Sequence, residues 1–117
     1  MIRLPGTILV AMEPVNLHLS FDRLASLVRE ELGGDPRADT VVVFHNRRRT
    51  HVKLLWHDGS GYALFYKRLD RHTFRIPLAV PAGARRVAVR REELRLLLEG
   101  LDEARVLRRA KALARAA

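Results

Sequence analysis

Hydrophobic positions in the first third of the chain predict a buried strand followed by an amphipathic helix. Residues 7–12 form a short apolar run before Pro14, which is typical of a strand inside a sheet. Farther along, apolar residues recur at helical spacing, with Ser20 placed to act as the N-cap and Gly33 as a stop. The sequence therefore predicts a helix over residues 20–32. Its apolar face comprises Phe21, Leu24, Ala25, Val28 and Leu32.

The centre of the chain has the pattern of an antiparallel hairpin. Residues 40–44 form a β-branched run, and residues 51–57 and 62–68 alternate around the tetrapeptide Asp-Gly-Ser-Gly at 58–61. Asp-Gly between two such segments is a strong signal for a tight turn. We therefore expect three strands here, with His57 opposite Tyr62.

One further strand is predicted after the hairpin, and a second, short one stays open. A turn near Asp70 leads into residues 73–78, which would pair Lys67 with Phe74, and residues 86–89 form another short β-branched segment. Together these elements predict an α+β fold: a mostly antiparallel sheet of four to five strands packed by the N-terminal helix, with C-terminal helices beside it.

The last forty residues predict helices and a basic tail. Residues 92–100 have leucines at helical spacing, and Asp102 is placed to cap a final helix. The size of the chain and the absence of a linker indicate one domain over residues 1–102, followed by a basic helix or tail at 103–117. The apolar stripe of the final helix comprises Val106, Leu107, Ala110, Leu113 and Ala114.

Alternation along the predicted sheet separates two faces, because successive side chains of a strand point to opposite sides. One face is apolar and is expected to be core: Val52, Leu54, Trp56, Ala63, Phe65, Phe74 and Ile76. The other face mixes rings with cations: Lys53, Leu55, His57, Tyr62, Leu64, Tyr66, Arg68, Thr73 and Arg75. Two interpretations of this second face stay open, an exposed binding platform or a surface that another helix covers.

The distribution of charge indicates a class of partner. The 117 residues carry a formal net charge of +9, and residues 45–75 contain eight Lys or Arg against two acids. Six of the seven aromatic residues also lie within 44–75, so rings and cations are interleaved. Cations bind phosphates and flat rings stack on bases, so this composition favours nucleic acid as the partner.

Several other classes are disfavoured by the sequence. The chain has no cysteine, which rules out disulfides and thiolate metal sites and is consistent with a reducing compartment. No apolar run resembles a signal peptide or a membrane span, so we expect a cytoplasmic protein without membrane contact. The histidines lack the spacing of a metal motif and no catalytic set can be picked out, so we expect no enzyme activity, no metal, no cofactor and no small-molecule substrate.

The candidate nucleic-acid contacts follow from the basic and aromatic positions. Tyr66 and Arg68 are the principal candidates, and Lys67, on the opposite face, contributes only if it lies at an edge. The arginine tripeptide after Asn46 is placed at a strand end, where its guanidinium groups could clamp phosphates. The full set is Arg47, Arg48, Arg49, Lys53, Tyr62, Tyr66, Lys67, Arg68 and Arg75.

The order of short motifs resembles a known family. The motifs are Phe44-x-Asn46-Arg47-Arg48-Arg49, Lys53-Leu54-Leu55, Asp58-Gly59-x-Gly61, Tyr66-Lys67-Arg68-Leu69, and Phe74 with Pro77. They are similar to those of the small accessory protein of IS66-type insertion sequences, the product of the second open reading frame beside the large DDE transposase, often labelled TnpB. One stretch departs from the family pattern Pro-x-Asp-Met-Arg-Lys: here an amide, Asn16, replaces the acid, and His18 and Leu19 replace the two cations.

This resemblance implies a non-catalytic helper of DNA transposition. Its expected partners are the DNA of the transposon ends and the DDE transposase, which the basic aromatic sheet face would bind. The alternative is a protein-interaction module that docks the transposase or forms a homodimer without touching DNA.

Overall fold

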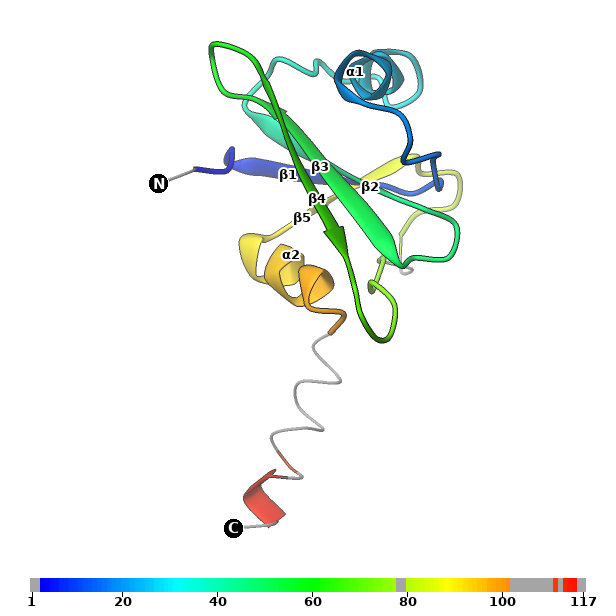
Figure 1. The fold of residues 1–117 in the computed structure, drawn as a ribbon, viewed down its shortest axis with the longest axis vertical. Helices are drawn as coiled ribbons and strands as arrows, with labels where there is room; N and C mark the ends of the chain where they lie inside the picture. The colour runs from blue at the N-terminus through cyan, green and yellow to red at the C-terminus, as the bar shows by residue number, and fades with distance from the viewer. Residues whose placement is uncertain (1–2, 78–79, 102–110, 112, 116–117) are drawn as a thin grey trace.

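A five-stranded mixed sheet forms the centre of the molecule, in the order β4-β3-β2-β1-β5 (Figure 1). The computed structural model describes residues 3–77, 80–101, 111 and 113–115. The strands are β1 (Thr7–Ala11), β2 (Thr40–His45), β3 (His51–His57), β4 (Tyr62–Arg68) and β5 (Arg86–Val89); the helices are α1 (Phe21–Glu30) and α2 (Arg91–Leu98).

The strand pairing confirms the α+β class and most of the predicted antiparallel pairing, with one parallel pair that the sequence did not predict. β1 and β2 are parallel, with Thr7 opposite Thr40, whereas the remaining neighbours are antiparallel. A parallel pair needs a crossover rather than a hairpin, and α1 provides it between β1 and β2. The sheet is therefore mixed, with α1 packed on one face.

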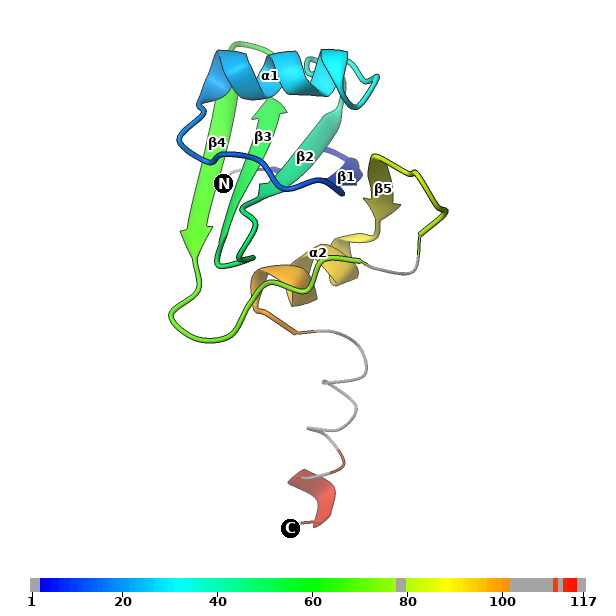
Figure 2. The ribbon, with the colours of Figure 1, turned by 90° about the vertical axis from the view of Figure 1, so that its right-hand side faces the viewer.

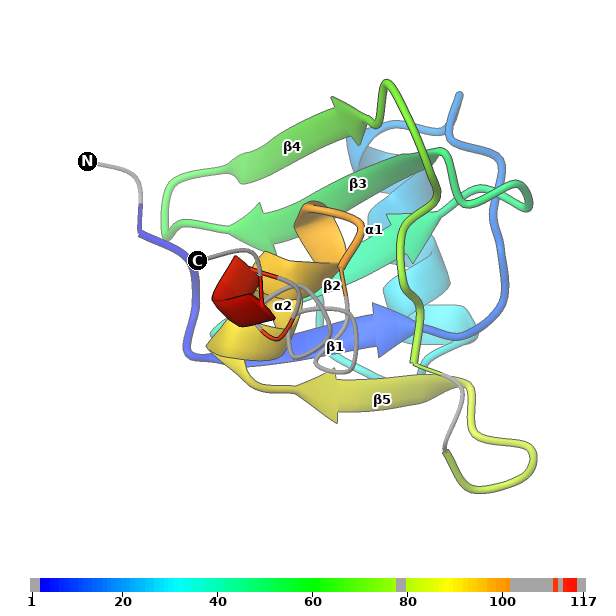
Figure 3. The same ribbon diagram turned by 90° about the horizontal axis from the view of Figure 1, so that it is seen from below.

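The two helices cover opposite faces of the sheet (Figure 2; Figure 3). On the α1 side, the core comprises Ala11, Leu17, Leu24, Ala25, Val28, Val42, Phe44 and Leu55. On the α2 side it comprises Ile8, Val10, Val41, Val43, Val52, Leu54, Trp56, Phe74, Ile76, Leu94 and Leu97. Because both faces are covered, residues 41–45 of β2 are all buried, as expected for a central strand between two layers.

The β3–β4 hairpin has the predicted register. His57 lies opposite Tyr62, and Lys53 lies opposite Tyr66. In the turn, one carboxylate oxygen of Asp58 accepts hydrogen bonds from the backbone N–H groups of Ser60 and Gly61, each at 3.0 Å. These bonds, with the one from the Ser60 hydroxyl, lower the pKa of Asp58. Asp58 therefore serves the turn.

The predicted strand at 73–78 is wrong over its described residues, 73–77, which lie outside any strand. The backbone N–H of Phe74 donates to the carbonyl oxygen of Arg49 at 2.7 Å, so it bonds the β2–β3 loop instead of Lys67. Phe74 is fully buried and Ile76 is 7% exposed, both in the α2-side core. Apolar residues alternate in this segment because Phe74 and Ile76 insert into the core, while the segment itself crosses the ends of the strands (Figure 3).

Two helix predictions are confirmed in position: α1 is shorter at both ends than predicted, and α2 begins one residue earlier and ends two residues earlier. Ser20 precedes α1 but makes no side-chain capping hydrogen bond. At the start of α2, the carboxylate of Glu93 accepts a hydrogen bond from the backbone N–H of Arg90 at 3.0 Å. The predicted final helix, with Asp102 as its cap, lies largely outside the described residues; Lys111 and residues 113–115 are helical. None of the described helices is long and apolar enough to cross a membrane.

We predict that Phe74→Ala lowers the free energy of unfolding by about 3–5 kcal/mol, because it opens a cavity in the core. The matched control is Phe65→Ala on edge strand β4, where the ring is 43% exposed; its expected cost is below about 1 kcal/mol. Urea unfolding of both variants measures the difference. Equal costs would mean that residues 73–77 do not pack as described.

Candidate nucleic-acid interface

A five-residue loop, residues 46–50, connects β2 to β3 and presents the arginine tripeptide. The side-chain oxygen of Asn46 accepts hydrogen bonds from the backbone N–H groups of Thr50 and His51 at 2.9 and 3.1 Å. Its side-chain nitrogen donates to the hydroxyl of Thr50 at 3.0 Å, and its backbone carbonyl oxygen accepts a hydrogen bond from the backbone N–H of Arg49 at 3.0 Å. One asparagine thus closes the loop and fixes its backbone.

The chain after β4 binds the same loop. The backbone N–H of Leu69 donates to the carbonyl oxygen of Thr50 at 3.0 Å, and Phe74 donates to Arg49 as described above. Among the described residues, Arg49 (φ 57°) and His72 (φ 65°) are the non-glycine residues with positive φ, and each lies in one of these two segments. Such a conformation costs about 1–2 kcal/mol per residue and persists only where the surroundings enforce it.

These two segments gather exposed cations at one end of the sheet, which we call the basic end: Arg47, Arg48, Arg49, Arg68 and Arg71. Within the described part of the chain, none of these guanidinium groups forms an ion pair or a side-chain hydrogen bond. The acid nearest in sequence is Asp70, which is also exposed. The charge of the basic end is therefore largely uncompensated and available to a polyanion.

Two flanking cations are less accessible. Lys67 is half-buried and points to the α2 side of edge strand β4, opposite to Tyr66 and Arg68. Arg75 is half-buried on the segment that follows, and its buried Nε atom has no hydrogen-bond partner among the residues that the structure describes. Both lie beside the basic end in sequence, but neither shares the full exposure of its five arginines.

The predicted platform face is exposed at one end only. At the turn end, Leu55 is buried against α1, and Tyr62 and Leu64 pack partly on the same core. The interpretation that a helix covers this face is therefore correct for that half. Thr73 and Arg75 are not part of the sheet, because their segment is not a strand. Exposure remains at the other end of β4, where Tyr66 and Arg68 lie.

Lys53 is buried beneath the exposed end of this face. It is only 8% exposed, and its ammonium donates a hydrogen bond to the carbonyl oxygen of Leu19 at 2.8 Å. The same nitrogen lies 4.9 Å from the centre of the Tyr66 ring. The structure thus places Lys53 beneath the surface, where it holds a ring and a backbone carbonyl.

His45, at the end of β2, is buried next to the arginine loop. Its Nε2 lies 2.9 Å from the carbonyl oxygen of Ala11, and its Nδ1 lies 3.3 Å from that of Asn46. We assign the proton to Nε2, which then donates to Ala11. Burial lowers the pKa of His45, and the charge of Arg49 adds to this effect, while the carbonyl oxygens oppose it. The neutral imidazole therefore joins β1 to the loop.

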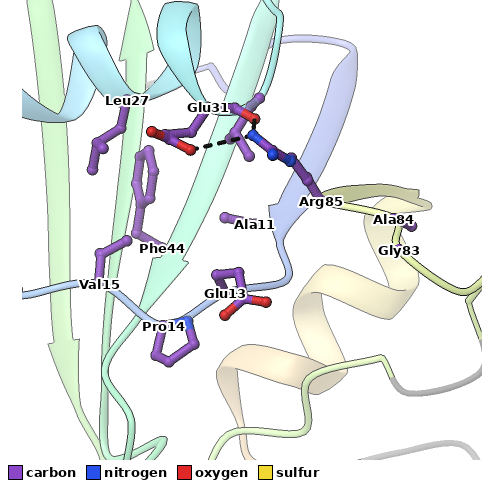
Figure 4. A pocket seen from close by; sticks show the side chains of 11 residues that line it. Ala11, Glu13, Pro14, Val15, Leu27, Glu31, Phe44, Gly83, Ala84 and Arg85 are labelled. Atoms are coloured by element: carbon purple, nitrogen blue, oxygen red, sulfur yellow. Dashed lines mark hydrogen bonds and ion pairs between the residues drawn. The ribbon is translucent and has the colours of Figure 1, made fainter.

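A cleft of about 520 Å³ lies on the α1 side, between the end of that helix, residues 13–15 and the loop at 83–85 (Figure 4). Leu27, Val15 and Phe44 form its apolar wall. Arg85 donates to the carboxylate of Glu31 at 3.2 Å across its rim. The described residues contain no group of three acids or histidines that could hold a metal ion.

Comparison with known proteins identifies the family. The sequence model described as "IS66 Orf2 like protein" matches residues 6–108, which is most of the chain. The chain belongs to the IS66 Orf2-like family. Its relatives include two proteins of Sinorhizobium fredii (strain NBRC 101917 / NGR234): "Uncharacterized protein y4hO", 37% identical over 80% of this chain and 78% of that protein, and "Uncharacterized protein y4jC", 35% identical over 87% and 85%. No solved structure gives a significant match.

Membership confirms the resemblance and fits an accessory role in transposition, separate from the catalytic transposase. The departure at Asn16 has a structural explanation in this IS66 Orf2-like protein. The side-chain oxygen of Asn16 accepts a hydrogen bond from the N–H of His18 at 2.9 Å, a role that a carboxylate also fulfils. Leu19, where the pattern has a cation, contributes its carbonyl oxygen to Lys53.

Three residues of this candidate site were not selected from the sequence. Arg71 is exposed at the basic end, but a predicted turn gave no reason to select it. His72 enters the sequence analysis only as one of the histidines without metal-motif spacing, and its positive φ is not visible in the sequence. Asn46 is part of a motif. Its position before three arginines and a threonine is the signal for a loop that the asparagine side chain closes by hydrogen bonds.

We predict that His45 makes the stability of this IS66 Orf2-like protein depend on pH. Its folded pKa lies below the ordinary value of about 6.5, so its contribution is fully present above pH 6.5 and declines as the pH falls through the folded pKa. His45→Gln should flatten the loss of unfolding free energy between pH 7.5 and 5.5, measured by urea titration. His18→Gln, at an exposed site, should retain the wild-type slope. An unchanged slope in His45→Gln would exclude this role.

Proposed function

We propose that this IS66 Orf2-like protein is a non-catalytic accessory protein that binds the DNA of transposon ends through the basic end. The main support for the proposal is the fixed arginine loop, whose guanidinium groups form no ion pair with any acid in the described part of the chain. We also propose that the protein binds this DNA in the cytoplasm, where it would act beside the DDE transposase.

Electrostatics supports DNA as the partner. Each arginine that neutralises a phosphate releases condensed counterions, and a guanidinium fork fits two phosphate oxygens. Arg47, Arg48 and Arg49 come from one loop, while Arg68 and Arg71 come from the end of β4 and the segment after it. Two segments joined by backbone hydrogen bonds thus offer one positive surface.

The arginine loop is also preorganised for binding. Ordering a flexible arginine loop during binding would cost conformational entropy. Here the Asn46 side chain already fixes the backbone before any ligand arrives. Lys67 and Arg75 flank the surface and contribute mainly long-range field, since both are half-buried.

A second function, docking of the transposase, is favoured by the cleft beside α1. Its wall is mostly apolar, and Pro14 and Val15 at its rim begin the stretch that departs from the family pattern. An apolar segment of the transposase, or of a second copy of this chain in a homodimer, would fit this surface. The two functions are compatible because the cleft and the basic end use different residues.

We predict that replacing Arg47, Arg48 and Arg49 together by alanine weakens DNA binding and its salt dependence. The slope of log affinity against log salt should fall by about two to three, because about one counterion is lost per phosphate contact. Fluorescence anisotropy with labelled transposon-end DNA at two salt concentrations measures this. The matched control replaces the exposed Arg23, Arg29 and Arg37, with the same loss of charge, and should retain a steeper slope than the loop variant.

Two outcomes would contradict DNA binding at the basic end. The first is an equal effect of both triple variants, which would indicate only a general effect of net charge. The second is the absence of salt-sensitive binding together with a salt-insensitive complex with transposase fragments. That second result would support docking at the cleft instead.

A further inference from the structure

We propose that Tyr66 is a stacking platform for an unpaired base, so that the basic end prefers single-stranded DNA to duplex. This inference rests on the proposed function and specifies its ligand. It is carried by the exposure of one tyrosine ring and by the buried lysine that fixes it.

The two halves of β4 differ in burial on the α1 side. Tyr62 and Leu64 are half-buried against the core beneath α1, whereas Tyr66 is 57% exposed and Arg68 is also exposed. β4 is an edge strand, so no further strand covers its outer side. Tyr66 is therefore the ring on this face that a ligand can reach without moving the helix.

The ammonium of Lys53 accounts for the fixed position of the ring. It lies 4.9 Å from the ring centre, on one face, and is held there by its hydrogen bond to Leu19 at 2.8 Å. The ring of His51 contacts Tyr66 as well, with centres 5.8 Å apart and planes tilted by 38°. The ring is 57% exposed although a cation lies over one of its faces, so part of the ring is open to a ligand.

Lysine is an unexpected residue at this buried position. An ammonium is costly to remove from water unless it finds partners, and an apolar side chain would fill the same space without that cost. The partners that the structure gives to the Lys53 ammonium are one carbonyl and the Tyr66 ring. We therefore assign Lys53 as a positioning residue whose role is to orient Tyr66.

The neighbours of Tyr66 identify the class of ligand. Arg68 lies two residues farther on the same face, roughly 7 Å along the strand, and the arginine loop lies beyond it. A flat face beside several phosphate-binding groups matches a nucleotide whose base is free to stack. Bases in a duplex are stacked on each other, so a ring on a protein surface reaches them only in single strands or frayed ends.

The test compares wild type, Tyr66→Ala and Tyr66→Phe by anisotropy at one salt concentration. Three labelled probes of equal length are used: a single strand, its duplex, and a single strand in which the central nucleotides lack bases. Wild type should bind the single strand more tightly than the duplex. Tyr66→Ala should lose about ten-fold or more on the single strand and less than about two-fold on the other two probes, while Tyr66→Phe retains wild-type affinity.

The abasic probe separates stacking from a phosphate contact by the hydroxyl group, because only stacking requires a base. Lys53→Met tests the positioning role: it should reduce single-strand affinity while affinity for the abasic probe is unchanged. Equal losses of Tyr66→Ala on all three probes, no loss on any, or a wild-type preference for duplex would overturn the inference and leave DNA binding intact. Wild type that binds none of the probes would overturn the proposed function, and the inference with it.

Discussion

Helices α1 and α2 bury opposite faces of one sheet, and this double coverage determines where charge can lie. β2 and β3 contribute side chains to both cores, so neither can display a row of cations. Lys53 is the basic residue on β3, and it is buried with its ammonium bonded to Leu19. The remaining cations of residues 45–75 are displaced to the loops and to edge strand β4. The basic end is a consequence of how the sheet is covered.

The arginine loop illustrates how local chemistry prepares such a surface. The side chain of Asn46 accepts hydrogen bonds from two backbone N–H groups of the loop. This network holds Arg49 at a positive φ, which is unfavourable for a residue with a side chain. His45 adds a neutral hydrogen bond to β1 directly before the loop. Rigid support and exposed charge thus occur in neighbouring residues, which is the arrangement expected of a preorganised binding site.

The sequence predicted those features that depend on local pattern. The β3–β4 hairpin follows from alternation around Asp58 and Gly59, and the family follows from motifs in a fixed order. The strand at 73–78 failed because Phe74 and Ile76 alternate in the same way whether the segment pairs with β4 or inserts into the core. The prediction of an exposed platform face is wrong in part because it used alternation alone. Leu54 and Leu55 are consecutive apolar residues, and such pairs indicate that both faces of a strand are covered.

We propose that the folded chain binds nucleic acid at the basic end and at Tyr66. The most direct measurement follows backbone amide chemical shifts while a single-stranded oligonucleotide is titrated into the protein. We expect the largest changes in residues 46–51 and 66–72, with the amides around Leu27 and Arg85 nearly unchanged. Changes concentrated at that cleft, or no change at any concentration, would contradict it.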